Sequence, residues 1–318
     1  MIAIIGPTAS GKTALAARLA HRIGGEVVSA DSRQVYRRMD IGTGKDLADY
    51  NVEGTTIPCH LVDIMEPGEK YNLFDYQADF LRAYKEVVSR QATPILCGGS
   101  GLYVESVLRG YRLSPAPQDS ALRESLQGKP LGELAAMLES LKRANGSNMH
   151  NTTDTETAQR AVRAIEIELS IRDGGAGRRE FPSISHTIIG VNVSRETRRR
   201  RISERLRQRL GGGLVEEVKA LLGEGVAAED LIYYGLEYKY VTEYVIGRRT
   251  YGDMVSNLET AIHQFAKRQM TWFRGMERRG LHIEWSPEDA GPGELLEWAL
   301  EKTAGQWRKQ KEDSYGRQ

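Results

Sequence analysis

The chain is poor in the features that mark secreted and membrane proteins. Its 318 residues include only two cysteines, Cys59 and Cys97, too few for a disulfide framework or a cysteine-rich zinc site. No run of eighteen apolar residues is present, and the N-terminus has neither a basic segment nor a small-residue cleavage site. We therefore expect a protein of the reducing cytoplasm that does not span a membrane.

An excess of charge of one sign is also missing. The 44 Lys and Arg residues nearly balance the 43 Asp and Glu residues, so the overall charge neither favours nor excludes a nucleic-acid partner. Apolar residues make up 40% of the chain and charged residues 27%, which is typical of a globular protein and not of a disordered one. The length allows one large domain, or one domain that carries an inserted second one.

Short apolar runs alternate with amphipathic patterns over much of the chain. Strands are predicted at Ile2–Ile5, Glu26–Ser29, Pro94–Cys97 and Thr187–Val193. Helical patterns follow at Thr13–Ile23, Phe74–Arg90, Arg198–Leu222 and Asp253–Arg279. This alternation predicts an α/β fold, with a mainly parallel sheet flanked by helices.

The strand pattern stops in the middle of the chain. Residues 114–185 have only helical patterns, between Ser114-Pro115-Ala116-Pro117 and Gly174-Gly175-Ala176-Gly177. We therefore predict a helical insertion at 114–185 that divides a core into residues 1–113 and 186–290. Residues 291–318 are charged and weakly patterned, which predicts a frayed tail.

One predicted helix carries an apolar stripe that should face the core. Within Asp253–Arg279, steps of three and four residues connect Met254, Leu258, Ile262, Phe265, Gln269 and Trp272. We interpret Trp272 as part of this core face and not as a surface on which a base stacks.

A phosphate-binding loop follows the first predicted strand. The pattern G-x-x-x-x-G-K-T is filled by Gly6, Pro7, Thr8, Ala9, Ser10, Gly11, Lys12 and Thr13. Backbone N–H groups and the N-terminus of the next helix form an anion site in such loops, and Lys12 adds a point charge. Thr13 is the expected ligand of a Mg²⁺ ion. The loop predicts a P-loop NTPase-like core that binds a diphosphate or triphosphate, and it leaves kinases, NTPases and diphosphate-releasing transferases open.

An acidic residue follows the second predicted strand. Asp31 stands in the string Ala30-Asp31-Ser32-Arg33-Gln34-Val35-Tyr36. Ligands of open α/β sheets bind beyond the carboxyl ends of the strands, so Asp31 should face the phosphate site. An aspartate in this position is often only a helix cap.

The string around Asp31 resembles the A-D-S-x-Q-V-Y motif of tRNA dimethylallyltransferases, the IPP transferase family. Three further blocks are similar to that family in the same order, and with the first they extend from Ile4 to about Trp285. These blocks are His60-Leu61-Val62-Asp63-Ile64 with Pro67, Pro94 to Tyr103, and Lys267-Arg268-Gln269-Met270-Thr271-Trp272-Phe273-Arg274.

The resemblance implies transfer of a dimethylallyl group from its diphosphate to N6 of an adenine beside the anticodon in tRNA. Asp31 is then the general base, Ser100 a hydrogen-bonding residue near the reacting groups where the family usually has Thr, and Arg201 a contact of the diphosphate. The implied partners are tRNA and dimethylallyl diphosphate, with Mg²⁺ as cofactor. We expect a monomer, because nothing in the sequence requires a second subunit.

The resemblance also implies a set of tRNA contacts. Gln159, Arg160 and Arg163 match a Q-R-x-x-R element in the predicted insertion. The full set is Asp31, Ser32, Arg33, Gln34, Ser100, Arg123, Gln159, Arg160, Arg163, Lys267, Arg268, Gln269 and Arg274. Independently of the resemblance, eight arginines crowd the segment Arg195–Arg209, which favours either a solvated helix face or phosphate contacts.

Two segments depart from the family pattern, and three other functions stay open. Gly235-Leu236-Glu237-Tyr238-Lys239 replaces a G-Y-K/R-E motif, and His150–Thr157 replaces an N-D-P block. The alternatives are a prenyltransferase that modifies free AMP, a P-loop kinase of a small molecule, and an RNA-binding module with a purely structural phosphate loop. A mononucleotide needs no long helical insertion, and a kinase gives no account of the block that begins at Lys267.

Overall fold

The computed structural model describes residues 1–146, 153–175 and 179–315, and its chain forms two compact units. The larger unit comprises Met1–Arg109 and Ser183–Gln318, and the smaller comprises Gly110–Pro182. The smaller unit is the counterpart of the helical insertion predicted at 114–185, with each limit a few residues earlier in the chain.

The larger unit is built on a six-stranded sheet with the strand order β5-β2-β6-β1-β7-β8. All five pairs of neighbouring strands are parallel, which confirms the predicted P-loop-type α/β fold. The strands are β1 (Ile2–Ile5), β2 (Gly25–Ser29), β5 (Cys59–His60), β6 (Thr93–Gly98), β7 (Thr187–Gly190) and β8 (Glu284–Trp285). The two-residue strands β5 and β8 are too short to give a sequence pattern. A separate antiparallel pair joins β3 (Asn51–Val52) to β4 (Thr55–Thr56).

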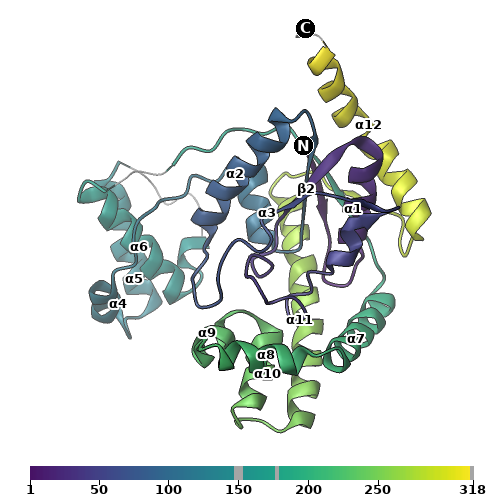
Figure 1. The fold of residues 1–318 in the computed structure, drawn as a ribbon. Coiled ribbons are helices and arrows are strands. Elements are labelled where there is room, and N and C mark those ends of the chain that lie inside the picture. Colours follow the sequence, from purple (N-terminus) through teal and green to yellow (C-terminus); the bar gives the residue numbers. More distant parts are fainter. Residues whose placement is uncertain (147–152, 176–178, 316–318) are drawn as a thin grey trace. The chain divides into compact units, whose positions relative to one another are not determined.

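Helices cover both faces of this sheet (Figure 1). Successive strand residues point to opposite faces, so Ile2 and Ile4 of β1 lie together in an apolar cluster with α1 and α12. Helices α2, α3 and α11 pack on the other face. The bounds are α1 (Lys12–Ile23), α2 (Leu73–Ser89), α3 (Gly101–Leu108), α7 (Arg195–Gly211), α8 (Leu214–Gly223), α9 (Ala228–Tyr233), α10 (Leu236–Val245), α11 (Tyr251–Arg278) and α12 (Pro292–Tyr315), with a 3-10 turn at Leu47–Tyr50.

The prediction of a frayed tail over 291–318 is wrong for much of its length. Helix α12 begins at Pro292, and its residues Leu295 and Ala299 are buried in the cluster that contains α1 and β7. Its apolar residues are concentrated in the short stretch Leu295–Leu300, and the charged residues that follow give little amphipathic pattern. Burial of a few side chains against α1 holds the helix where local pattern did not predict it.

The smaller unit is helical. Its elements are α4 (Ser120–Leu126), α5 (Leu131–Ala144), a 3-10 turn at Thr153–Thr155 and α6 (Ala158–Arg172). Leu134 and Leu138 of α5 pack with Ala161 and Ile165 of α6 in an apolar core separate from that of the larger unit. The helices of the smaller unit therefore pack on one another around a core of their own.

An ion pair between a buried glutamate and a half-exposed arginine joins α3 to the end of α11 and gives a test of the fold. The Glu105 carboxylate is fully buried and accepts hydrogen bonds from Nε and Nη2 of Arg279, at 2.7 and 2.6 Å. Arg279→Ala leaves this carboxylate uncompensated, so we expect the free energy of unfolding in urea to fall, by less than the roughly 3–5 kcal/mol of a fully buried pair because the Arg279 side chain is half exposed. Arg278→Ala, at an exposed neighbouring position, should change it little. Adding Glu105→Gln to Arg279→Ala should restore part of the loss, because the buried group is then uncharged.

Candidate active site

The phosphate loop connects β1 to α1 as the sequence predicts. Gly11 has a φ of 87°, in the left-handed region that favours glycine, directly before α1 begins at Lys12. This turn presents successive backbone N–H groups together with the positive end of the helix dipole. The loop therefore has the geometry of an anion site.

Gln269 of α11 forms hydrogen bonds that hold the phosphate loop in place. Its Oε1 accepts a hydrogen bond from the Thr8 N–H at 2.8 Å, and its Nε2 donates to the Gly99 carbonyl at 2.9 Å. A Cβ atom at Gly99 would lie only 2.5 Å from Gln269 Nε2, so a larger residue at this position would displace the amide. The buried amide thus ties the loop to the end of β6. We predicted Gln269 as a tRNA contact, and the structure gives it a supporting role in the site.

One cavity brings Asp31, Lys12 and Thr13 together. It has a volume of about 420 Å³, and we name it the Asp31 cavity. Other residues lining it are Thr8, Ser32, Arg33, Gln34, Gly99, Ser100, Arg205, Arg209, Glu237, Phe265, Arg268, Gln269 and Trp272. The Asp31 carboxylate accepts a hydrogen bond from the Arg33 N–H at 2.9 Å, which fixes its direction. Ser100 Oγ accepts from the Ser32 N–H at 3.2 Å and thereby holds the loop after β2.

Desolvation shifts the pKa values of Lys12, Glu237 and Cys97 in this cavity. Loss of solvent lowers the pKa of the Lys12 ammonium, although the negative charge of Asp31 acts in the opposite direction. Burial likewise raises the pKa of Glu237, against the nearby charge of Arg209. Burial raises the pKa of the Cys97 thiol to about 12, so this cysteine stays protonated and is no nucleophile at neutral pH.

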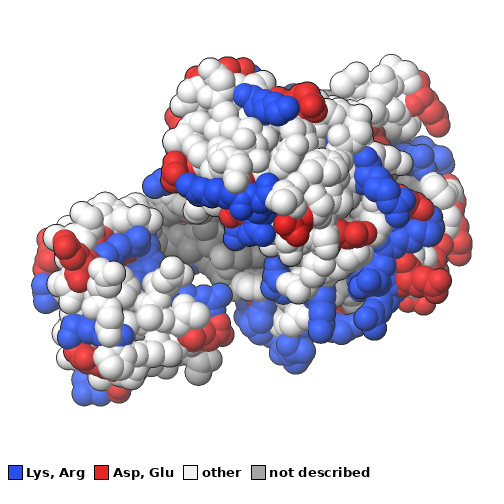
Figure 2. Space-filling view, turned by 90° about the horizontal axis from the view of Figure 1, so that it is seen from below, with Lys and Arg blue, Asp and Glu red and all other residues white. Residues whose placement is uncertain are grey.

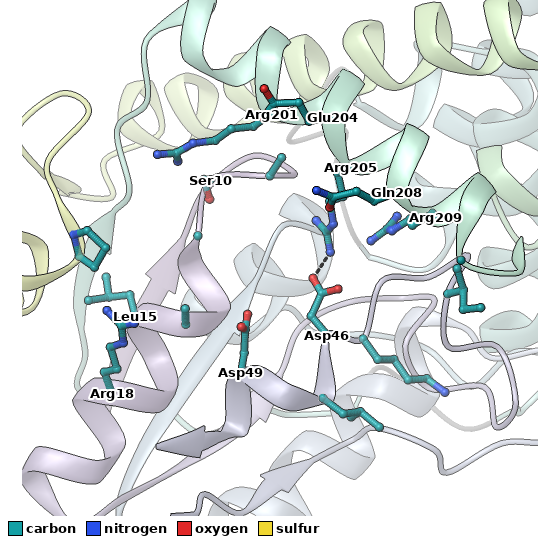
Figure 3. Close-up of a pocket in the computed structure, with 18 of the residues that line it drawn as sticks. Ser10, Leu15, Arg18, Asp46, Asp49, Arg201, Glu204, Arg205, Gln208 and Arg209 are labelled. Atoms are coloured by element: carbon teal, nitrogen blue, oxygen red, sulfur yellow. Dashed lines mark hydrogen bonds and ion pairs between the residues drawn. The ribbon is translucent and has the colours of Figure 1, made fainter. Parts of the chain in front are cut away.

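A second cavity, the Arg201 cavity, lies against other residues of the phosphate loop. It has a volume of about 850 Å³ and is lined by Ser10, Gly11, Arg18, Asp46, Asp49 and five residues of α7, among others. Figure 3 shows Arg201, Arg205 and Arg209 projecting from α7 toward it, with an ion pair between Arg205 and Asp46. Arg205 and Arg209 also line the Asp31 cavity.

Arg201 does not line the cavity that contains Asp31 and Ser100, the other two residues predicted to be catalytic. Asp31, Ser100 and Lys12 share one cavity, whereas Arg201 lines only the other. Positions 201, 205 and 209 are four residues apart, so their side chains form a row along one helix face over about 12 Å. The diphosphate contact predicted for Arg201 stays a prediction, and Arg205 and Arg209 are the arginines of α7 that line the cavity of Lys12.

The lowered pKa of Lys12 gives a pH prediction. An amine with a depressed pKa loses its proton at a pH below the ordinary lysine value of 10.5. We expect the affinity for an allylic diphosphate to fall as the pH rises through this depressed pKa, and binding to take up protons because the bound anion raises the pKa again. Calorimetry in buffers of different ionisation enthalpy measures both effects. Lys12→Arg keeps its charge at every accessible pH and should show no such alkaline decline.

Two family models match the chain. The model described as IPP transferase matches residues 34–276, and the model described as isopentenyl transferase matches residues 1–59. The chain belongs to the IPP transferase family. The first match covers well over half of the chain, and the second contains the phosphate loop and Asp31.

Relatives of similar length support this membership. The chain is 59% identical over 285 residues to tRNA dimethylallyltransferase 2 of Phocaeicola vulgatus, with 90% of this chain and 91% of that protein covered. It is 47% identical over 292 residues to tRNA dimethylallyltransferase 2 of Pelobacter propionicus, with coverage of 92% and 91%.

Solved structures show the same fold. The crystal structure of a tRNA isopentenylpyrophosphate transferase from Bacillus halodurans superposes with a TM-score of 0.70 at 30% identity and covers 99% of this chain and 98% of that one. A eukaryotic dimethylallyltransferase acting on tRNA gives a TM-score of 0.69 at 19% identity, with 90% and 73% covered. The second likeness is one of fold alone.

The tRNA contacts predicted in the smaller unit take part in ion pairs there. Glu166 is almost fully buried, and Arg123 and Arg163 both donate to its carboxylate, at distances of 2.6 to 3.0 Å. Burial alone would raise the pKa of Glu166, but these hydrogen bonds lower it overall. Arg160 pairs with Glu156, and Gln159 is exposed. Arg123 therefore joins α4 to α6, whereas Arg163 pairs within α6 and donates to the carbonyls of Ala116 and Pro117. Their contact with RNA stays a prediction.

The remaining predicted tRNA residues lie in the larger unit. Lys267, Arg268 and Arg274 are exposed on α11, while Ser32, Arg33 and Gln34 line the Asp31 cavity. Figure 2 shows Lys and Arg side chains across the lower face of the larger unit, where α7 to α11 lie in Figure 1. Of the departing segment His150–Thr157, residues 150–152 lie outside the described residues.

The core stripe predicted on α11 is wrong at two positions. Phe265 is 38% exposed and Trp272 only partly buried, and both line the Asp31 cavity. The buried positions include Ala266, Phe273 and Met276 instead. Ala266 and Phe273 each follow the predicted residue by one position, so the buried face of the helix is offset there from the face that lines the cavity.

Sequence reasoning missed Glu217, which organises a loop beside the cavity. From the first turn of α8, its carboxylate accepts hydrogen bonds from the N–H groups of Asp40, Ile41 and Gly42 at 2.8 to 3.0 Å, and from the Tyr238 hydroxyl at 2.6 Å. Glu237, in the wall of the cavity, was also missed as a site residue. No local sequence pattern marks either residue, because their hydrogen-bond and ion-pair partners lie more than twenty residues away in the chain.

Proposed function

We propose that this protein transfers a dimethylallyl group from dimethylallyl diphosphate to N6 of an adenine adjacent to the anticodon in tRNA, with release of diphosphate. The observation that carries the proposal is the shared cavity of Asp31 and Lys12. A base and an anion site must lie together if an amine is to attack a carbon attached to a diphosphate. The tRNA dimethylallyltransferases that resemble this chain along nine-tenths of its length support the choice of substrates.

The chemistry follows from the groups in the cavity. The N6 lone pair attacks C1 of the prenyl group, the C1–O bond breaks, and its electron pair leaves with the diphosphate. Lys12 and the N–H groups of the phosphate loop stabilise the charge that develops on the leaving oxygens. The N6 proton passes to the Asp31 carboxylate, which contributes about 10²- to 10⁴-fold. Arg205 and Arg209 supply further positive charge beside Lys12.

The residues present fit a Mg²⁺ ion that arrives with the diphosphate. The described residues contain no group of three or more His, Cys, Asp or Glu side chains that could hold a metal. Mg²⁺ at phosphate loops needs no such cage, because it binds one or two protein oxygens together with phosphate oxygens and waters. We propose that the Thr13 hydroxyl holds it. A bound Mg²⁺ would neutralise charge on the leaving diphosphate.

One experiment separates this function from its rivals. The protein is incubated with labelled dimethylallyl diphosphate and either an unmodified anticodon stem-loop RNA or AMP, and labelled products are measured. We expect label in the RNA and none in AMP. Label in AMP alone would identify an adenylate prenyltransferase, and ATP turnover dependent on Lys12 without any prenyl product would identify a kinase. RNA binding without either reaction would leave a binding module.

Oligomeric state and location belong to the same proposal. We propose a monomeric enzyme of the cytoplasm, where its tRNA substrate is found. None of the helices in the described residues is long and apolar enough to span a bilayer. Sedimentation of the purified chain measures the oligomeric state.

A further inference from the structure

Two aromatic side chains at the Asp31 cavity, Tyr233 and Phe265, are exposed. Tyr233, at the end of α9, is 55% exposed, and Phe265 of α11 is 38% exposed. Phe265 lines the cavity, and Tyr233 directly precedes Tyr234 and Gly235, which also line it. Large exposed aromatic groups next to a cavity are typical of a binding surface.

An arginine that lines the cavity lies over each of these rings. The guanidinium carbon of Arg33 lies 5.2 Å from the centre of the Tyr233 ring, and that of Arg268 lies 5.9 Å from the centre of the Phe265 ring. Neither arginine forms an ion pair with a residue in the described part of the chain. The two arginine–aromatic pairs come from separate elements, one from α9 with the loop after β2, and the other from α11.

We propose that the Arg33–Tyr233 and Arg268–Phe265 pairs are stacking platforms for the two nucleotides that flank the target adenine in single-stranded RNA. An adenine that enters the cavity must leave the base stack, and its neighbours then lose a stacking partner. Flat aromatic rings and arginine planes are the surfaces on which unstacked bases bind, whatever their sequence. The unpaired guanidinium groups also suit the phosphates between such bases.

This inference rests on the proposed function, because the flanking nucleotides exist only if the acceptor is RNA. It adds two residues, Tyr233 and Phe265, that the family motifs do not mark. It also assigns a role to Arg33 and Arg268, since each would contact both its aromatic partner and the base that stacks there. The alternative occupant, a protein segment, would use the same rings but would not respond to the removal of an RNA base.

A double-mutant cycle tests the proposal. Dissociation constants are measured for the intact anticodon stem-loop and for two RNAs with an abasic site on the 5′ or the 3′ side of the target adenine. Tyr233→Ala and Phe265→Ala should each weaken binding of the intact RNA by about 5- to 150-fold. Each effect should shrink to about twofold with the RNA that lacks the base its platform holds, because the two changes then remove the same contact.

Tyr251→Ala is the matched control. Tyr251 is a tyrosine of α11 that is 49% exposed, packs against the ring of Tyr244, and lines neither described cavity. Its replacement should leave RNA affinity unchanged. Tyr233→Phe keeps the ring and should bind like the wild type. Thermal unfolding of all variants checks that the fold is intact, as expected for exposed positions.

The outcomes are distinct from those that test the enzyme itself. The platforms are wrong if Tyr233→Ala and Phe265→Ala bind RNA as tightly as Tyr251→Ala does. They are also wrong if the loss of affinity in each variant is the same with every abasic RNA. Either result counts against the platforms even when the wild type makes prenylated RNA. If the wild type binds RNA with the expected coupling and yields no prenyl product, the platforms stand and the proposed reaction fails.

Discussion

Asp31→Asn should lower the single-turnover rate of prenyl transfer to RNA by about 10²- to 10⁴-fold, because the amide cannot take the proton from the attacking amine. The side chain keeps its size, and its oxygen can still accept the hydrogen bond from the Arg33 N–H. Binding of the donor should therefore stay close to that of the wild type. Rapid quenching with labelled donor measures the rate, and equilibrium binding of a non-reactive donor analogue measures the affinity.

The carboxylate of Asp31 is one of two in its cavity, and Glu237 provides the comparison. Glu237→Gln removes the second negative charge without touching the proposed base, so its rate should fall far less than that of Asp31→Asn. A variant Asp31→Asn that keeps more than about one-tenth of the wild-type rate would refute the role of Asp31 as base.

Lys12→Ala should lower kcat/KM for the donor by about 10²- to 10³-fold, as removal of a single preorganised charge beside a leaving group does. The N–H groups of the phosphate loop stay in place, so some donor binding should persist. Initial rates at saturating RNA and varied donor measure the effect. RNA affinity, measured without donor, should not change.

Lys85→Ala is the control for removal of a lysine. Lys85 is exposed on α2, away from both cavities, and its replacement should leave kcat/KM unchanged. An unchanged kcat/KM in Lys12→Ala would mean that the phosphate loop does not hold the reacting diphosphate. That result would refute the interpretation of Gly6–Thr13 as a catalytic anion site.

The sequence was most informative where function depends on local backbone geometry. A glycine-rich loop between a strand and a helix makes an anion site by itself, so Gly11, Lys12 and Thr13 could be identified from their spacing. The carboxyl ends of parallel strands meet at one edge of a sheet, so the neighbourhood of Asp31 and Ser100 could also be anticipated. The structure places these residues in one cavity.

The sequence pattern was a poorer guide to helices whose position depends on contacts with distant parts of the chain. Helix α12 has a weak pattern and is held by burial of Leu295 and Ala299 against α1. On α11, the apolar stripe did not distinguish Phe265 and Trp272, which face a cavity, from Phe273, which faces the core. Both kinds of surface attract aromatic residues, so composition alone could not separate them.

The sequence by itself determined the class of fold, the anion loop and the acidic residue opposite it, because each follows from short-range geometry. Only the tertiary structure decided that Arg205 and Arg209, and not Arg201, line the same cavity as Lys12, and that Gln269 holds Thr8. These relations join residues that are up to 261 positions apart. Which side chains meet over such distances depends on how helices pack on the sheet, and no local pattern records it.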